Sequence, residues 1–165
     1  MARHTNRDKD SKKNAALVEE KHMLEAELLR QLRDPDWKVW ESVAAHPKAT
    51  KHVLLEALNN EHRIVRFVAA GHPSATERVL LLAMQDDDWQ VRLTAAANKN
   101  ATEQLLMIAL KDQDSNIRAA AAGNLNTTRQ VLLVAVTDKQ WGVCIAALKN
   151  PNATEDVLMI AKEDN

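Results

Sequence analysis

Three consecutive carboxylates, Asp86, Asp87 and Asp88, stand directly before Trp89 in the sequence. A cluster of carboxylates could bind a divalent cation or transfer protons in a reaction. Consecutive residues at the start of a helix point in different directions, so these three are not expected to converge on one ion. Capping of free N–H groups and interaction with the helix dipole explain them better. The cluster therefore predicts a helix start, with no catalytic and no metal-binding residue.

Two histidines, His46 and His72, lie 26 residues apart and could suggest a metal site. Two histidines that share one zinc ion need nitrogens about 3 to 4 Å apart, whereas packed neighbouring helices are roughly 8 to 10 Å apart. We therefore expect them to close a turn between helices, as Asn98, Asn124 and Asn150 do at equivalent positions. The sequence also has no Ser-His-Asp or Cys-His arrangement in register and no phosphate loop. It predicts a protein that is not an enzyme and has no cofactor.

Three arginines recur at the same 26-residue spacing and could bind phosphates or an acidic partner. The alternative is structural, with each guanidinium paired to the acidic residue that begins an adjacent block of sequence, such as Arg92 with Asp112 or Asp86. We favour the structural interpretation, because the arginine is replaced in the outer blocks, by Trp40 and by Cys144. The predicted ladder consists of Arg66, Arg92, Arg118, Asp86, Asp112 and Asp138.

Three of the four tryptophans are spaced at twice this interval. At 100° of rotation per helical residue, Trp89 lies about 160° from the expected core residue Val91, and Leu93 lies about 200° from it. The two side chains therefore share the helix face opposite the core. Across the five blocks, this face carries Trp37 and Glu41, Arg63 and Phe67, Trp89 and Leu93, Ser115 and Ala119, and Trp141 and Ile145.

This face allows two interpretations of the tryptophans. If the helices that carry it line a concave side, the face is a binding surface for a protein or peptide segment, because Trp, Phe and Arg are common in binding hot spots. Alternatively, the tryptophans fold over neighbouring loops and complete the core. The predicted partner-binding residues are Trp37, Arg63, Phe67, Trp89, Leu93, Trp141 and Ile145.

Five blocks of sequence position these residues and align without a gap. One apolar position recurs in each, at Val39, Val65, Val91, Ile117 and Val143. Each block predicts a first helix that begins near an acidic residue and ends at His or Asn, and a second helix capped by a recurring threonine. The second helix is apolar nearly all round, so we expect it to be buried. The blocks span residues 34-59, 60-85, 86-111, 112-137 and 138-165.

A pair of helices of about ten residues each cannot bury its own apolar surface, whereas five stacked pairs form a continuous core. The sequence thus predicts an all-α fold, a right-handed α-solenoid of five 26-residue two-helix repeats. Residues 15-33 are expected to form an N-terminal capping helix, because Leu28 and Leu32 fall on leucines of the first block when shifted by 26 positions. Residues 1-14 are expected to form a disordered polar tail.

The spacing from Asp86 to Val91 and Arg92, followed by alanines, resembles the HEAT-repeat signature. The stretches AAHPKATKHVLLEAL and LKNPNATEDVLMIA are similar to leucine-rich repeat variant (LRV) repeats, and the resemblance covers residues 34-165. It implies an α-solenoid scaffold. The iron–sulfur cluster associated with the LRV family is not expected here, because the chain lacks its cysteines. A second implication is nucleic-acid processing, as in HEAT-like DNA glycosylases, with aromatics stacking on bases and the arginines contacting phosphates.

Composition narrows these possibilities. With 165 residues, of which 45% are apolar, the chain can form one domain with a substantial core. Its apolar runs are far shorter than the roughly 20 residues that span a bilayer, and its N-terminus is too polar for a signal peptide. We therefore expect a cytoplasmic protein with no membrane contact. A single cysteine excludes an internal disulfide, and a net charge of -1 disfavours nucleic acid as the partner. The sequence leaves the oligomeric state open.

Overall fold

The computed structural model describes the backbone of residues 2–163 and the side chains of residues 13–160. It is helical throughout, with no strand in the described range, so the all-α prediction is confirmed. Short turns of a few residues separate the helices. They are α1 (Ala2–Gln31), α2 (Trp37–Ala44), α3 (Lys51–Leu58), α4 (Arg63–Gly71), α5 (Glu77–Ala83), α6 (Trp89–Ala97), α7 (Glu103–Ala109), α8 (Ser115–Gly123), α9 (Arg129–Ala135), α10 (Trp141–Lys149) and α11 (Glu155–Glu163).

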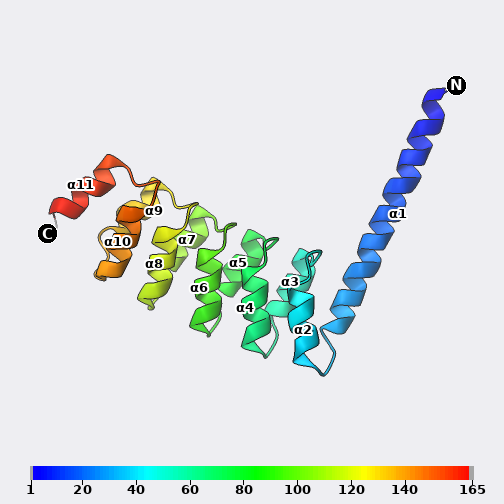
Figure 1. Cartoon of the computed structure of the whole chain (residues 1–165), viewed down its shortest axis with the longest axis horizontal. Helices are drawn as coiled ribbons and strands as arrows, with labels where there is room; N and C mark the ends of the chain where they lie inside the picture. The colour runs from blue at the N-terminus through cyan, green and yellow to red at the C-terminus, as the bar shows by residue number, and fades with distance from the viewer. Residues whose placement is uncertain (1, 164–165) are drawn as a thin grey trace.

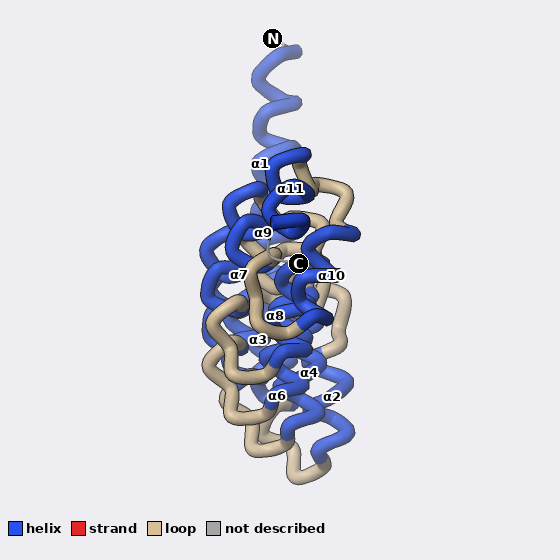
Figure 2. Tube along the Cα trace, turned by 90° about the vertical axis from the view of Figure 1, so that its left-hand side faces the viewer, coloured by secondary structure: helices blue, strands red, loops and turns tan. Residues whose placement is uncertain are grey.

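From α2 onwards, the helices alternate between two layers. The first helix of each block, α2, α4, α6, α8 or α10, lies in one layer, and the second, α3, α5, α7, α9 or α11, lies in the other (Figure 1). Viewed along the row of helices, the two layers lie side by side (Figure 2). Each helix packs on its partner in the block and on the equivalent helix of the next block. The blocks are therefore stacked in chain order.

The core fills the space between the two layers. The second helices α3, α5, α7 and α9 each contribute a fully buried leucine at the same position of their blocks, whereas the equivalent leucine of α11, Leu158, is exposed. Each first helix contributes a fully buried or nearly buried valine, isoleucine or alanine. Adjacent alanine pairs such as Ala95 and Ala96 are also fully buried, and their small side chains let neighbouring first helices approach closely. The buried leucines of the second helices are Leu54, Leu80, Leu106 and Leu132.

Helix α1 differs from the prediction for the N-terminus. It is one continuous helix from Ala2 to Gln31, where the sequence analysis predicts a disordered tail over 1-14 and a separate capping helix over 15-33. The segment contains no glycine or proline before Pro35, so nothing in the backbone stops the helix earlier. The C-terminal part of α1 packs against α2 and α3, where Leu28 is buried, and the rest projects away from the stack (Figure 1).

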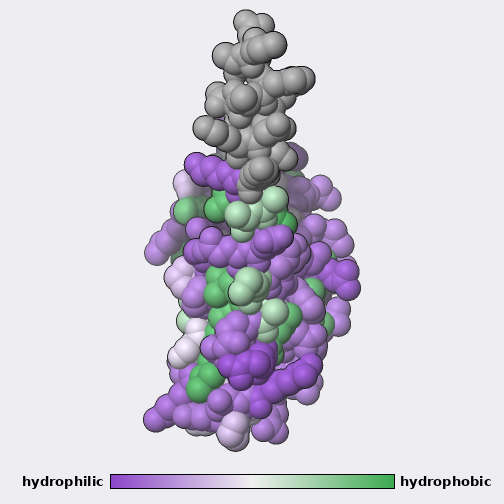
Figure 3. Space-filling view, turned by 90° about the vertical axis from the view of Figure 1, so that its right-hand side faces the viewer, coloured by the Kyte–Doolittle hydropathy of each residue, from purple (hydrophilic) through white to green (hydrophobic). Residues whose placement is uncertain are grey.

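The projecting part of α1 is polar, with a few exposed apolar side chains. Leu17, Val18 and Met23 are exposed on it. Viewed from this end of the molecule, hydrophobic residues form a band bordered by hydrophilic ones (Figure 3). Although α1 has 30 residues, neither it nor any other described helix is apolar over a stretch long enough to cross a membrane.

The prediction that the second helices are buried is wrong on one side. Leu82, Ile108 and Val134 occupy the same position in α5, α7 and α9, and all three side chains are exposed. The reason is that a stack of two layers covers each helix on one side only. An apolar sequence pattern around a whole helix therefore leaves an apolar row on the outside.

Candidate functional site

A ladder of three ion pairs connects four consecutive blocks, the second to the fifth. Arg92 donates from Nε and Nη2 to the two carboxylate oxygens of Asp112, at 2.8 and 3.3 Å, while its Nη1 donates to the backbone carbonyls of Asp86 and Asp87. The other two pairs repeat this geometry. They are Arg66 with Asp86, at 2.7 and 3.1 Å, and Arg118 with Asp138, at 2.7 and 3.1 Å.

Two of the ladder carboxylates, Asp112 and Asp138, have pKa values below their ordinary value because of their hydrogen-bond partners. The hydrogen bond from Arg118 lowers the pKa of Asp138 below its ordinary value. Burial works to raise the pKa of Asp112, but hydrogen bonds from Arg92 and from the N–H of Asp114 bring it below its ordinary value. Since all three guanidinium nitrogens of each ladder arginine donate to partners within the chain, Arg66 and its equivalents are not free to contact phosphates.

The acidic cluster that precedes Trp89 has structural partners. Asp86 accepts from Arg66 and from the N–H of Asp88, and Asp88 in turn accepts from the N–H of Gln90 as the N-cap of α6. Only the side chain of Asp87 is exposed without such a role. Among the described residues, no group of three His, Cys, Asp or Glu side chains is placed to hold a metal ion.

The ladder ends where the arginine is replaced. Trp40 occupies the arginine position of the first block. At the position where the other blocks have the partner aspartate, the second block has Asn60. The indole N–H of Trp40 is buried and has no hydrogen-bond partner among the described atoms. At the other end, the thiol of Cys144 donates to the carbonyl of Asp138 at 3.0 Å. At the first block, the arginine and its acidic partner are therefore replaced together.

A second ladder runs through the turns that follow the first helices. The buried side chain of Asn98 donates to the carbonyls of Ala70 and His72, at 2.8 and 3.3 Å, and accepts from the N–H of Asn100. Asn124 and Asn150 make the same three bonds one and two blocks later. His72 holds the same place with its ring, since Nε2 lies 3.1 Å from the carbonyl of His46 and Nδ1 accepts from Ser74. The Asn and His residues thus join consecutive turns.

The exposed face of the first helices carries large apolar side chains on α4, α6 and α10. Phe67 and Trp89 are each 45% exposed, and Trp141 is 65% exposed, while Leu93 is half-buried beside them. Leu125, in the turn after α8, is 73% exposed. We call this face, lined by Phe67, Trp89, Leu93, Leu125 and Trp141, the first-helix surface.

Two furrows cross the first-helix surface between neighbouring helices. One, of about 580 Å³, lies between α4 and α6 and is lined by Phe67, Gly71, Pro73, Leu93, Thr94, Ala97, Asn98 and Lys99. The other, of about 430 Å³, lies between α6 and α8 and is lined by Ala97, Lys99, Ala120, Gly123, Asn124, Leu125 and Asn126. They share Ala97 and Lys99, so they are adjacent. Small residues at the helix ends, Gly71, Ala97 and Gly123, leave the space that the furrows occupy.

The other predicted site residues are less accessible or are engaged. Trp37 is half-buried and stacks on His62, with ring centroids 6.0 Å apart, and Trp40 packs edge-on against the same ring. Arg63 donates to the side chain of Gln90 and lies 3.7 Å from Asp88. Ile145 is half-buried. The structure therefore brings Phe67, Leu93 and Trp89 into one apolar region, and leaves Trp37 as part of an aromatic cluster at the first block.

Sequence reasoning missed several residues of this surface. Leu125 stands where other blocks have Pro47, Pro73 or Lys99, so a large apolar residue in a polar turn was a usable signal. The furrows carried no such signal, because glycine and alanine at a helix end are ordinary residues there.

Comparison of the chain with protein-family models and with curated proteins finds no match. The similarity of its blocks to LRV and HEAT repeats therefore rests on the residues quoted above.

Proposed function

We propose that this protein is a non-enzymatic, right-handed α-solenoid scaffold of the LRV or HEAT-like type, with five two-helix repeats, and that it binds a protein or peptide segment along its first-helix surface. The observation that carries the proposal is that Phe67 and Leu125, both exposed, line two adjacent furrows, while Trp89 and Trp141 are exposed on first helices of the same layer. Large apolar side chains gathered on one face are typical of interaction surfaces.

Packing supports assigning this face to the concave side of the stack. Neighbouring first helices pack together more closely than neighbouring second helices do. In a curved stack, the layer with the closer spacing lies on the inside. A groove on that side would hold a segment that runs across several helices, because Trp89 and Trp141 are two blocks apart and cannot enclose one small molecule.

Nucleic acid is a poorer partner for this surface. A phosphate backbone needs free cations, and the three ladder arginines donate to carboxylates and carbonyls of their own chain. The first-helix surface offers apolar side chains and the single charged residue of the furrows, Lys99. This composition suits a peptide with apolar side chains.

Selection from a displayed library of random peptides tests the proposal. We expect the wild-type protein to enrich peptides with spaced apolar residues. Synthetic copies of these peptides should bind the Trp89→Ala variant about 30-fold more weakly, the effect expected of a binding hot spot. Fluorescence anisotropy with labelled peptides measures this difference.

The control for that experiment is Met23→Ala on α1, since this side chain is 74% exposed and lies outside the first-helix surface. It should leave peptide binding unchanged. Melting temperatures of both variants establish that they are folded. The proposal is refuted if no peptide is enriched, or if the selected peptides bind Trp89→Ala as tightly as wild type.

A further inference from the structure

We propose that a crevice between α1 and the turns before α3 and α5 binds an acidic peptide segment, through three lysines and two backbone carbonyls. The crevice has a volume of about 570 Å³, within the range of roughly 300–1,000 Å³ that is common for ligand sites. We call it the α1 crevice. It shares no lining residue with the two furrows of the first-helix surface, so it is a separate site from the one proposed above.

The α1 crevice opens where α1 leaves the stack. The C-terminal part of α1 packs against α2 and α3, and towards its N-terminus the helix projects away from them (Figure 1). Leu24 is accordingly half-buried and Leu17 is 54% exposed. At 100° per residue, Leu17, Lys21 and Leu24 share one face of the helix, and all three line the crevice. This side of the crevice offers apolar contacts beside a cation.

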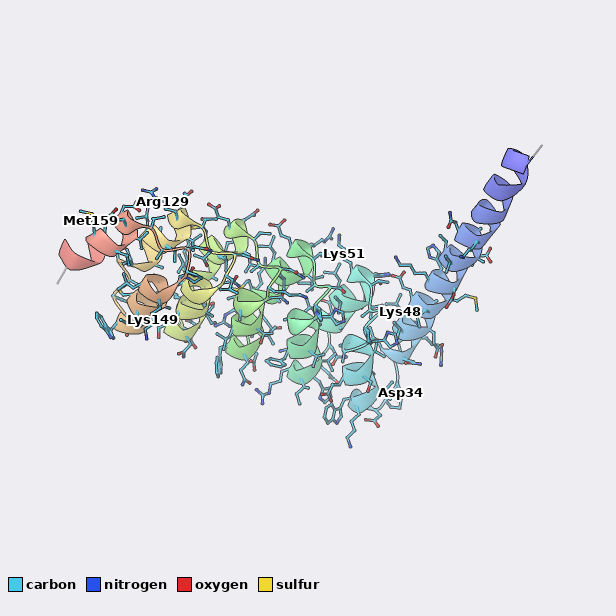
Figure 4. The ribbon with its side chains drawn as sticks, turned by 45° about the horizontal axis from the view of Figure 1, so that its top comes forward. Asp34, Lys48, Lys51, Arg129, Lys149 and Met159 are labelled. Atoms are coloured by element: carbon cyan, nitrogen blue, oxygen red, sulfur yellow. The ribbon has the colours of Figure 1, made fainter. Side chains whose placement is uncertain are left out.

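The opposite side of the crevice adds two more cations. Lys48 and Lys51 line it from the turn before α3 and from the first residue of that helix, on the side of the stack that faces α1 (Figure 4). Neither they nor Lys21 forms an ion pair within the described part of the chain. Their ammonium groups are therefore available to a ligand.

These cations are particular to the first block. The later blocks have serine or asparagine at the position of Lys48. At the position of Lys51, three of the four later blocks have an acidic residue, Glu77, Glu103 or Glu155. The lysines thus have no counterpart in the repeated framework of the stack, and packing of the blocks does not require them.

Two carboxylates limit the charge of the ligand. Glu20 lines the crevice, and Glu25 lies beside it, where it accepts from Thr50 Oγ1 at 2.8 Å and lies 3.4 Å from His52 Nδ1. With His52 neutral, three lysines and two glutamates leave one positive charge. One carboxylate matches that charge, whereas a phosphate group carries about −1.5 to −2 at pH 7. The balance therefore favours an acidic side chain over a phosphate.

Two backbone carbonyls give the site a feature that suits a peptide. In the third block, Asn100 donates to two carbonyls of the preceding turn, at 2.8 and 3.0 Å, and the two later blocks repeat these bonds. Ser74 replaces this asparagine in the second block, and no described residue donates to the equivalent carbonyls of Pro47 and Ala49. Both residues line the crevice. N–H groups of a bound peptide can take the place of the missing amide.

An array of synthetic octapeptides tests the site. Each peptide carries one Asp or Glu among apolar and neutral residues, and a matched peptide carries Asn or Gln instead. We expect the full chain to bind a subset of the acidic peptides and to bind their amide counterparts more weakly. For these peptides, fluorescence anisotropy should show about tenfold weaker binding to Lys48→Ala/Lys51→Ala, because an exposed ion pair contributes up to about fivefold each.

Two control variants separate this site from other surfaces. Lys149→Ala removes an exposed lysine at the opposite end of the stack (Figure 4) and should bind like wild type. Trp89→Ala should also bind like wild type, so the α1 crevice and the first-helix surface can fail independently. The proposal is overturned if no acidic peptide is preferred over its amide counterpart, if the double lysine variant binds as tightly as wild type, or if inorganic phosphate displaces the peptides at constant ionic strength.

The role of the two carbonyls has its own test at Ser74. Ser74→Asn supplies the amide that the later blocks have, so it should weaken peptide binding about fivefold, the effect of one ordinary hydrogen bond. Ser74→Ala leaves both carbonyls open and should bind like wild type. Circular dichroism establishes that each variant is folded. A Ser74→Asn protein that binds as tightly as wild type, or a Ser74→Ala protein that binds more weakly, would contradict the proposed use of the carbonyls and overturn the site as described.

Discussion

Replacing Asn98 with alanine removes three hydrogen bonds, two of which join the second and third blocks. The side chain donates to the carbonyls of Ala70 and His72 at 2.8 and 3.3 Å, and accepts from the N–H of Asn100 at 2.9 Å. Asn98 is only 7% exposed, so water cannot replace all of these bonds after the substitution. The variant therefore leaves backbone groups at the end of α4 and in the next turn without partners.

The size of the effect follows from these bonds. A buried hydrogen bond contributes about 1 kcal/mol net, and a buried group left without a partner costs about 1–3 kcal/mol. We expect Asn98→Ala to lower the free energy of unfolding by about 3 kcal/mol, a large part of the 5–15 kcal/mol typical of a domain. At roughly 2–4 °C per kcal/mol for a chain of this size, the melting temperature should fall by about 9 °C.

The chain supplies its own matched comparison, because His72 occupies the equivalent position one block earlier. Its ring makes two of the three contacts, to the carbonyl of His46 and from the N–H of Ser74. Asn98→His should therefore lose only about 1 kcal/mol, the value of the one missing bond. Urea unfolding followed by circular dichroism measures both variants. The reasoning is refuted if Asn98→Ala is within 0.5 kcal/mol of wild type, roughly the effect of an ordinary surface substitution, or if the histidine variant is no more stable than the alanine variant.

Two further predictions concern the ion-pair ladder and the helix ends. Asp138→Asn should cost about 3 kcal/mol at pH 7, because it leaves the buried Arg118 without its counter-charge. The pKa of Asp138 is lowered in the folded state. The stabilisation that its carboxylate gives the folded state is therefore fully present above the ordinary pKa of about 3.9, and is lost as the pH falls through the lower pKa of the folded state. Urea unfolding at pH 7 and pH 3 measures the difference in free energy of unfolding between wild type and Asp138→Asn. This difference should be smaller at pH 3, and an equal difference at both pH values would contradict the prediction. Gly123→Ala should stabilise α8 by about 0.5–1 kcal/mol, since φ is not positive and no atom lies within 4 Å of an added Cβ. Gly71→Ala should be stabilised less, because its Cβ would lie 3.2 Å from Thr94 Cγ2. Thermal melts of both glycine variants measure these gains, and equal gains in melting temperature would contradict the packing difference.

The sequence by itself determined the helical fold and the places where the helices begin and end. The 26-residue spacing of equivalent residues, the aspartates and threonines before each helix, and the His or Asn after each first helix are local signals. Local signals suffice for such features because a cap or a turn depends on residues only a few positions apart. The failure at the N-terminus is also local in origin, since polarity suggested a tail, whereas the absence of glycine and proline permits a helix.

Only the tertiary structure decided which partner each side chain meets across the blocks. Arg92 could pair with Asp86 or Asp112 as far as the sequence shows, and stacking brings the carboxylate of Asp112 to it. The exposure of Trp89, the partial burial of Trp37 against His62, and the exposed row through Ile108 likewise depend on how many layers cover each helix. A periodic pattern assigns a side chain to a helix face, but only packing determines whether another helix, a turn or water lies against that face.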